Sequence, residues 1–164
     1  MTTQAGTQLS NPGARTFVGR AKELGRLREA LNDAGPVLCY VHGIAGVGKS
    51  ALLSEFARFA RNEGATVVTL DCRTIEPTER GFLESLAAAS GAEADDLEAV
   101  SNRLKSLSGR VVLSLDAYEV FRFLDSWLRE TFIPSLEENV RLVLAGREPP
   151  VLTWLTSPSC ITRL

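Results

Sequence analysis

The sequence predicts an α/β fold, a three-layer sandwich in which a mainly parallel sheet carries helices on both faces. Helical patterns alternate with short apolar strands, which implies parallel pairing with both faces covered. A glycine-rich loop, Gly43–Ser50, joins the first strand to a helix and reads G-x-x-x-x-G-K-S, the phosphate-binding P-loop pattern. The length of 164 residues suits one domain with a sizeable core.

The chain is expected to begin with a flexible leader, residues 1–15, because its first fourteen residues carry no charge and are rich in Thr, Gln, Gly and Asn. The P-loop domain should then occupy residues 16–164. Its first helix is predicted from one apolar face, and Gly35-Pro36 should end it. That face consists of Leu24, Leu27, Ala30 and Leu31.

The rest of the chain alternates strands with helices. Apolar or β-branched runs predict strands at 37–42, 66–70, 111–116 and 142–145, and residues 161–164 could begin a fifth. Apolar stripes at helical spacing predict helices near 52–60, 82–87, 97–107 and 118–130. Glycines lie just beyond the first three of these helices, and Pro134 should stop the last one.

The P-loop gives the strongest indication of function. Glycines at its bends let backbone N–H groups approach a phosphate, and the helix N-terminus adds more donors and a partial positive charge. Lys49 can reach the β- and γ-phosphates, and Ser50 can place a hydroxyl on Mg²⁺. The alternative is a glycine-rich turn that only caps a helix. The expected nucleotide contacts are Gly43, Gly46, Val47, Gly48, Lys49, Ser50 and Ala51.

An acidic residue, Asp116, ends the strand at 111–116. In open α/β sheets this rim binds ligands, so Asp116 is expected to hold Mg²⁺, usually through water, opposite Ser50. The local alternative is an N-cap of the following helix. Glu119 could orient or deprotonate an attacking water, or it could be a first-turn acid favoured by the helix dipole.

Four elements in a fixed order resemble the AAA-like and STAND (signal-transduction) ATPases. Phe17-Val18-Gly19-Arg20, with Glu23 and Leu24 behind it, resembles the motif that precedes the P-loop in that group. Asp116–Glu119 is similar to the STAND form of the Walker B motif. Leu144–Arg147 resembles the strand and arginine called sensor 1. The resemblance covers about residues 16–150.

The resemblance implies several roles. Val18 and Gly19 would pack near the adenine, Arg147 would sense the γ-phosphate, and the strand order would be 5-1-4-3-2. Most AAA+ enzymes carry Glu where this chain has Ala117, which argues against fast hydrolysis. The lid and effector modules that normally follow are missing, so the chain looks like the amino-terminal core of something longer, truncated at its C-terminal end. The alternative for Arg147 is a loop arginine paired with Glu148 or another surface acid.

The leading functional hypothesis is a Mg-ATP-binding core that switches conformation with nucleotide state and hydrolyses slowly. Lys49, Ser50 with Mg²⁺, and Arg147 would stabilise γ-phosphate charge while a water near Glu119 attacks. A small-molecule kinase is an alternative, although the segment from Glu93 to Glu98 is acidic where a kinase lid would need arginines. A nucleotide-binding module without turnover is another. A GTPase is disfavoured because no Asn-Lys-x-Asp motif is found.

Composition bounds the partners. With 18 basic and 20 acidic residues and a net charge of −2, the segment is expected not to bind nucleic acid directly. Three scattered cysteines suit a reducing compartment, and no apolar run suggests a signal peptide or a membrane span, so the cytoplasm is expected. The expected partners are ATP or ADP, other domains of a longer protein, and further copies in a nucleotide-dependent oligomer.

Overall fold

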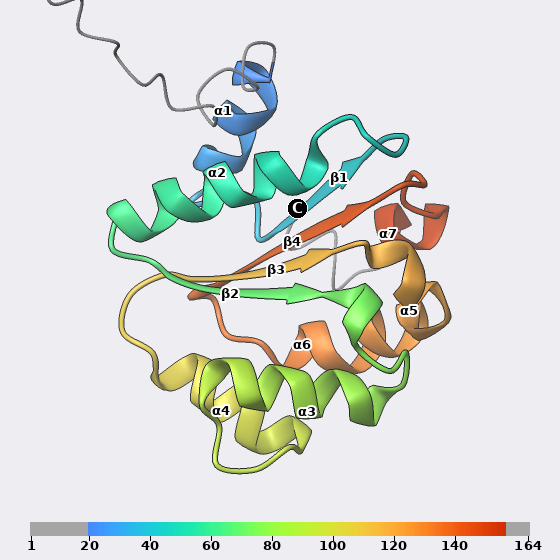
Figure 1. Ribbon diagram of the computed structural model, residues 1–164. Coiled ribbons are helices and arrows are strands. Elements are labelled where there is room, and N and C mark those ends of the chain that lie inside the picture. Colours follow the sequence, from blue (N-terminus) through green and yellow to red (C-terminus); the bar gives the residue numbers. More distant parts are fainter. Residues whose placement is uncertain (1–19, 157–164) are drawn as a thin grey trace, which may run out of the picture.

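A parallel sheet forms the centre of the molecule (Figure 1). The computed structural model describes residues 20–156, and in this range the sheet has four strands in the order β1-β4-β3-β2. These strands are β1 (Leu38–His42), β2 (Thr66–Asp71), β3 (Val111–Asp116) and β4 (Val140–Gly146). The predicted leader and the predicted fifth strand at 161–164 lie outside the described residues. The place of a fifth strand beside β1 therefore stays a prediction.

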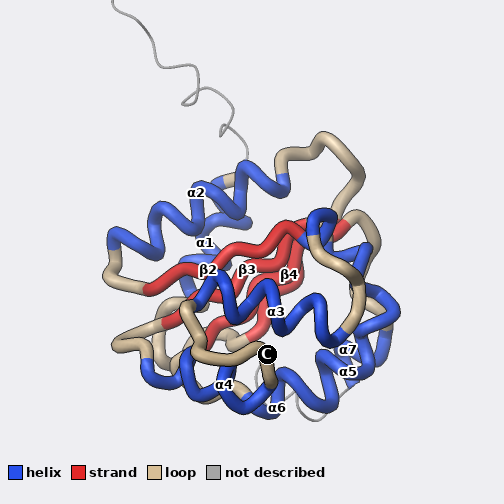
Figure 2. Tube along the Cα trace, turned by 60° about the horizontal axis from the view of Figure 1, so that its bottom comes forward, coloured by secondary structure: helices blue, strands red, loops and turns tan. Residues whose placement is uncertain are grey.

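Helices cover both faces of the sheet, which confirms the predicted three-layer α/β fold. Helices α1 (Ala21–Glu29) and α2 (Lys49–Asn62) lie on one face. Helices α3 (Glu79–Ser90) and α4 (Leu97–Ser106) lie on the other, as Figure 2 also shows. Successive strand residues alternate between the two cores: Val143 packs with α1 and α2, whereas Leu142 and Leu144 pack on the opposite side. Every residue of β4 is buried, as expected for a central parallel strand.

The segment after β3 differs from the prediction of one helix over 118–130. It is a chain of short turns: a 3₁₀ segment η3 (Tyr118–Leu124), α5 (Asp125–Trp127), a π-helical segment η4 (Leu128–Phe132) and α6 (Ile133–Ser135). Pro134 lies inside α6 and does not stop the helical path. A proline ring clashes with the carbonyl four residues earlier in a regular α-helix. The wider π turn, in which the Ile133 N–H donates to the Leu128 carbonyl, accommodates it.

Two short elements complete the described fold. A 3₁₀ turn, η2 (Cys72–Thr74), follows β2, and a short helix, α7 (Leu152–Thr156), follows β4. Trp154 of α7 packs edge-on against Tyr118, with ring centroids 6.0 Å apart. Within residues 20–156, the longest apolar stretch of any helix falls short of what crossing a bilayer requires.

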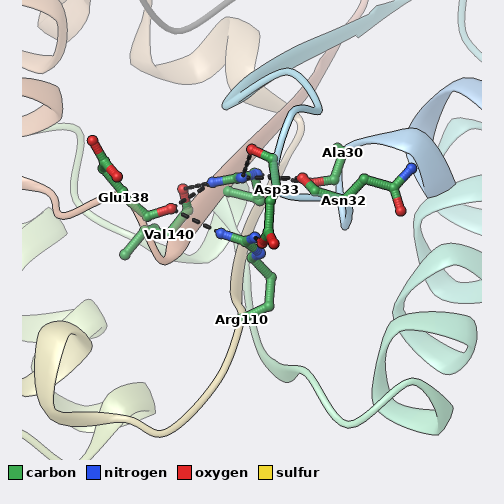
Figure 3. Close-up of polar contacts among 7 residues, drawn as sticks. Ala30, Asn32, Asp33, Arg110, Glu138 and Val140 are labelled. Atoms are coloured by element: carbon green, nitrogen blue, oxygen red, sulfur yellow. Dashed lines mark hydrogen bonds and ion pairs between the residues drawn. The ribbon is translucent and has the colours of Figure 1, made fainter.

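A buried arginine, Arg141, ties the end of α1 to the sheet, and Figure 3 labels the residues whose carbonyls it reaches. Arg141, near the start of β4 and only 2% exposed, donates to the carbonyls of Ala30 at 2.7 Å and Glu138 at 2.6 Å. It also reaches the carbonyls of Asn32, Asp33 and Val140. Burial lowers the pKa of Arg141. The clamp gives the Ala30 carbonyl at the end of α1 a donor, and it lies at the opposite end of β4 from the P-loop rim.

Candidate functional site

Two glycines shape the loop between β1 and α2. Gly46 and Gly48 have φ angles of 80° and 84°, in the left-handed region that glycine adopts without strain. Gly48 occupies the N-cap of α2, and no side chain of the described residues caps this helix start. The first N–H groups of α2 therefore lack the side-chain acceptor that most helix starts have, and such an end favours an anion. The loop fits a phosphate better than the role of a simple capping turn.

Lys49 folds back over the loop. Its Nζ donates to the carbonyl of Gly43 at 2.5 Å and to that of Ile44 at 3.0 Å. The side chain therefore lies along the P-loop and not in the hydrophobic core. An ammonium group has three donors, and carbonyl oxygens are acceptors that phosphate oxygens can replace. This placement puts the positive charge of Lys49 against the loop that is predicted to hold phosphates.

Ser50 and Asp116 meet although they are 66 positions apart in the sequence. The Ser50 hydroxyl donates to Asp116 Oδ2 at 2.5 Å, and Asp116 Oδ1 accepts from the Ala117 N–H at 2.8 Å. An N-cap would instead accept from the second or third residue of the helix. Ala117, whose φ is 54°, occupies the cap position of η3 and has no side-chain cap. A hydroxyl beside a carboxylate suits Mg²⁺, which takes few protein ligands alongside phosphate and water.

Glu119 and Arg147 contact each other. The Arg147 backbone N–H donates to Glu119 Oε2 at 3.1 Å, and Arg147 Nε pairs with Oε1 at 3.0 Å. The side chain of Glu119 is 22% exposed and that of Arg147 is 62% exposed. The interpretation of Arg147 as a loop residue predicted that it pairs with an acid, and it does pair with one. That acid is Glu119, which is itself the candidate for orienting or deprotonating the attacking water. Both residues lie at the rim where β3 and β4 end.

A second acid–arginine pair at this rim was missed by the sequence reasoning. Asp71 ends β2 and lies beside Asp116 in the strand register. Arg73 donates to both Asp71 carboxylate oxygens, through Nε at 2.8 Å and Nη2 at 2.7 Å. These hydrogen bonds lower the pKa of Asp71. The signal was available, because Asp71 directly follows the predicted strand at 66–70 just as Asp116 ends its own strand.

Cavities lie on both sides of this rim. One of about 220 Å³ extends from Ser50 and Asp116 along α2 to Arg61. Another of about 550 Å³ follows the outer side of β1, with Arg20 and His42 in its lining. Val18 and Gly19, predicted to lie near the adenine, fall outside the described residues. Arg20 is therefore the one residue of that motif whose position can be related to the P-loop.

Comparison with known proteins gives a family match. The model of the family described as AAA ATPase domain matches residues 16–143. It does not distinguish the STAND subgroup. No curated protein sequence matches the chain.

Solved structures with the same fold include Cdc6 and ORC proteins. Cdc6p from Pyrobaculum aerophilum superposes with a TM-score of 0.67 at 16% identity, covering 88% of this chain and 43% of that one. ORC1 from Aeropyrum pernix, in complex with DNA, has a TM-score of 0.65 at 21% identity, with 89% and 43% covered. Drosophila ORC bound to DNA gives 0.63 at 19% identity, with 81% and 38% covered. The chain thus spans about two fifths of the length of these solved chains.

These structures correct one expectation. The near-neutral charge predicted that the segment does not bind nucleic acid directly, and that prediction is contradicted, because two of these structures with the same fold are DNA-bound. Net charge is a poor guide here, since phosphate backbones are bound by local groups of cations and backbone N–H groups.

Proposed function

Because the chain belongs to the AAA ATPase domain family, we propose that it binds Mg-ATP at the P-loop rim and hydrolyses it slowly, as a nucleotide-dependent switch. The contact between Ser50 and Asp116 carries this proposal. It joins the P-loop to the end of β3 and pairs the two oxygen ligands that Mg²⁺ would need from the protein.

Each rim residue has a defined task in the proposal. Lys49 exchanges its contacts with the loop carbonyls for oxygens of the β- and γ-phosphates, and Ser50 and Asp116 hold Mg²⁺. The metal, when bound, neutralises charge that develops on the transferred phosphoryl group. Arg147 adds a cation on the γ-phosphate side, and Glu119 orients the attacking water.

Two features support slow turnover. The residue directly after Asp116 is Ala117, which has no carboxylate to activate water. Glu119 is engaged by Arg147. A slow enzyme suits a switch, in which ATP and ADP favour different conformations through their differential affinity. The STAND-like spacing from Asp116 to Glu119 supports the same role, and the cysteine usage supports a cytoplasmic location.

The alternatives make different chemical predictions. A small-molecule kinase needs a basic lid over its acceptor. The acidic segment Glu93–Glu98 instead runs from the loop after α3 into the first turn of α4, on the face of the sheet away from α2 (Figure 1). A kinase would transfer phosphate to an organic acceptor, and a binding module without turnover would release no phosphate. Single-turnover measurement of inorganic phosphate from ATP separates slow hydrolysis from the other two, and formation of ADP without inorganic phosphate in the presence of an acceptor separates a kinase from a binding module.

The first test of the proposal is Lys49→Ala. Losing one charge-assisted contact with phosphate costs about 1.5–3 kcal/mol, which is roughly a 10- to 150-fold loss of Mg-ATP affinity. Isothermal titration measures this, and thermal melting checks that the fold is kept. The control is Lys105→Ala, which removes an exposed lysine of α4 that pairs with Glu137 and should leave ATP affinity unchanged. Unchanged affinity in Lys49→Ala would overturn the P-loop assignment.

A further inference from the structure

The carboxylate of Glu119 is held by one residue through two different contacts. Oε2 accepts a hydrogen bond from the backbone N–H of Arg147 at 3.1 Å, and Oε1 forms an ion pair with the side-chain Nε at 3.0 Å. The carboxylate also lies close to Gly146, because a Cβ placed there would lie 3.4 Å from Glu119 Oε2 and 3.4 Å from the Tyr40 hydroxyl oxygen, which is about van der Waals contact. The carboxylate is thus seated against the end of β4.

The hydrogen bond and the ion pair between Glu119 and Arg147 engage both of their proposed functional groups. A carboxylate whose two oxygens face one residue has fewer lone pairs left to orient an attacking water. A guanidinium beside a carboxylate also attracts a phosphate less strongly, because the neighbouring negative charge offsets its own and repels the phosphate. In the described structure, each residue therefore limits what the other can do.

We propose that Glu119 and the γ-phosphate of ATP compete for Arg147, so that Glu119 sets the preference between ATP and ADP. The inference rests on the proposed function. When the γ-phosphate takes the guanidinium, Glu119 loses its ion-pair partner and becomes able to act on water. ADP has no γ-phosphate and leaves the pair intact. Sensing and water activation are then coupled through one ion pair.

Orientation of Arg147 by Glu119, instead of competition for it, predicts the opposite effect on ATP binding. If Glu119 served to orient Arg147 toward the phosphate, removing Glu119 would weaken ATP binding. If the two competed, removing Glu119 would strengthen it. The pair is partly exposed, and ion pairs of this kind are weak, so the expected gain in ATP affinity is about two- to fivefold.

Titration calorimetry with ADP and with a non-hydrolysable ATP analogue, both with Mg²⁺, tests the competition. Glu119→Ala should bind the ATP analogue about two- to fivefold more tightly and leave ADP affinity unchanged. Arg147→Ala should weaken the analogue about tenfold or more and spare ADP. In Glu119→Ala/Arg147→Ala, affinity should equal that of Arg147→Ala, because the acid has no cation left to hold.

Glu148→Gln is the matched control, since it removes the acid next to Arg147 in sequence and leaves Glu119 in place. It should leave the ratio of ATP-analogue to ADP affinity unchanged. Glu119→Gln, which keeps the side-chain shape and removes the charge, should show the same direction as Glu119→Ala and replaces it if alanine disturbs the fold. Thermal melting of each variant reports on folding.

Several outcomes overturn the competition. Weaker or unchanged binding of the ATP analogue by Glu119→Ala would overturn it. A gain in analogue affinity that persists in Glu119→Ala/Arg147→Ala, or that Glu148→Gln reproduces, would also overturn it, because such a gain would reflect general charge repulsion. If the unmodified chain binds nucleotide in a Lys49-dependent way, but Glu119→Ala leaves the ratio of ATP-analogue to ADP affinity unchanged, the competition alone fails. If it binds no nucleotide, the proposed function fails, and the competition fails with it.

Discussion

The carboxylate of Asp116 accepts hydrogen bonds from Ser50 and from Ala117. Its two interpretations, a metal ligand and a local structural residue, can be separated by experiment. As a metal ligand it should matter only when Mg²⁺ is present, so Asp116→Ala should weaken Mg-ATP binding and leave ATP binding in EDTA unchanged. As a local structural residue it would lower stability by about 0.5–2 kcal/mol and weaken both equally. Calorimetry with and without EDTA, together with urea unfolding, distinguishes the two.

Asp96 supplies the matched control for this prediction. It is the N-cap of α4 and accepts from the Ala99 N–H at 2.8 Å. Asp96→Ala should lower the free energy of unfolding by about 0.5–2 kcal/mol without any change in the Mg²⁺ dependence of ATP binding. If Asp116→Ala behaves like Asp96→Ala in both measurements, Asp116 does not hold the metal.

Single residues differed in how well the sequence could predict them. Ser50 and Asp116 were paired in advance because a motif and a strand end each fix a position on the same rim. The pairing of Glu119 with Arg147 was not foreseen, since it depends on the conformation of the chain after β3. Arg141 was missed altogether, because a charged residue inside an apolar strand looks like an exposed one until its carbonyl partners, Ala30 and Glu138, are placed.

At the scale of elements, regular helices and strands followed from periodicity, and the segment over 118–135 did not. Apolar residues at helical spacing fit α, 3₁₀ and π turns about equally well over so few residues. The choice is made by packing: Phe82 contacts Phe121, Trp127 and Phe132 at ring centroid distances of 5.9, 5.9 and 4.9 Å. Such contacts join α3 to this segment and are not visible in local sequence.

The clamp between α1 and β4 gives a prediction about element docking. Arg141→Met keeps much of the side-chain volume and removes donors to several carbonyls, so it should lower the free energy of unfolding by about 2–4 kcal/mol. Arg141→Lys should recover only part of this, because a compact ammonium cannot reach carbonyls spread over both elements. Urea denaturation measures each change.

An exposed arginine serves as the control for the clamp. Among residues 20–156, Arg58 on α2 pairs with Glu55 alone, and its side chain is 64% exposed. Arg58→Met should change stability by no more than about 0.5 kcal/mol. If Arg141→Met is equally mild, the carbonyls of the α1 end find other donors and the clamp does not hold α1 on the sheet.

At the scale of the whole molecule, sheet topology brings the ends of β1, β3 and β4 to one rim. The central position of β4 was expected from the family resemblance, and its complete burial fits the apolar run that predicted it. The partner class could not be predicted from net charge, because charge summed over 137 described residues and two terminal segments says nothing about where cations gather.

Because the rim joins the P-loop to strands at the centre of the sheet, ligand binding should stabilise the domain as a unit. At a nucleotide concentration one hundred times Kd, Mg-ATP analogue should add about 2.7 kcal/mol to the folded state. For a domain of this size that corresponds to a rise in Tm of roughly 5–11 °C, measurable by scanning calorimetry. Lys49→Ala at the same nucleotide concentration should keep only about 0.3–1.4 kcal/mol of this stabilisation, a rise of roughly 1–6 °C. A saturated complex without any rise in Tm would mean that the P-loop and α2 open separately from the core formed by β3 and β4, and the site would then not be coupled to the fold that carries it.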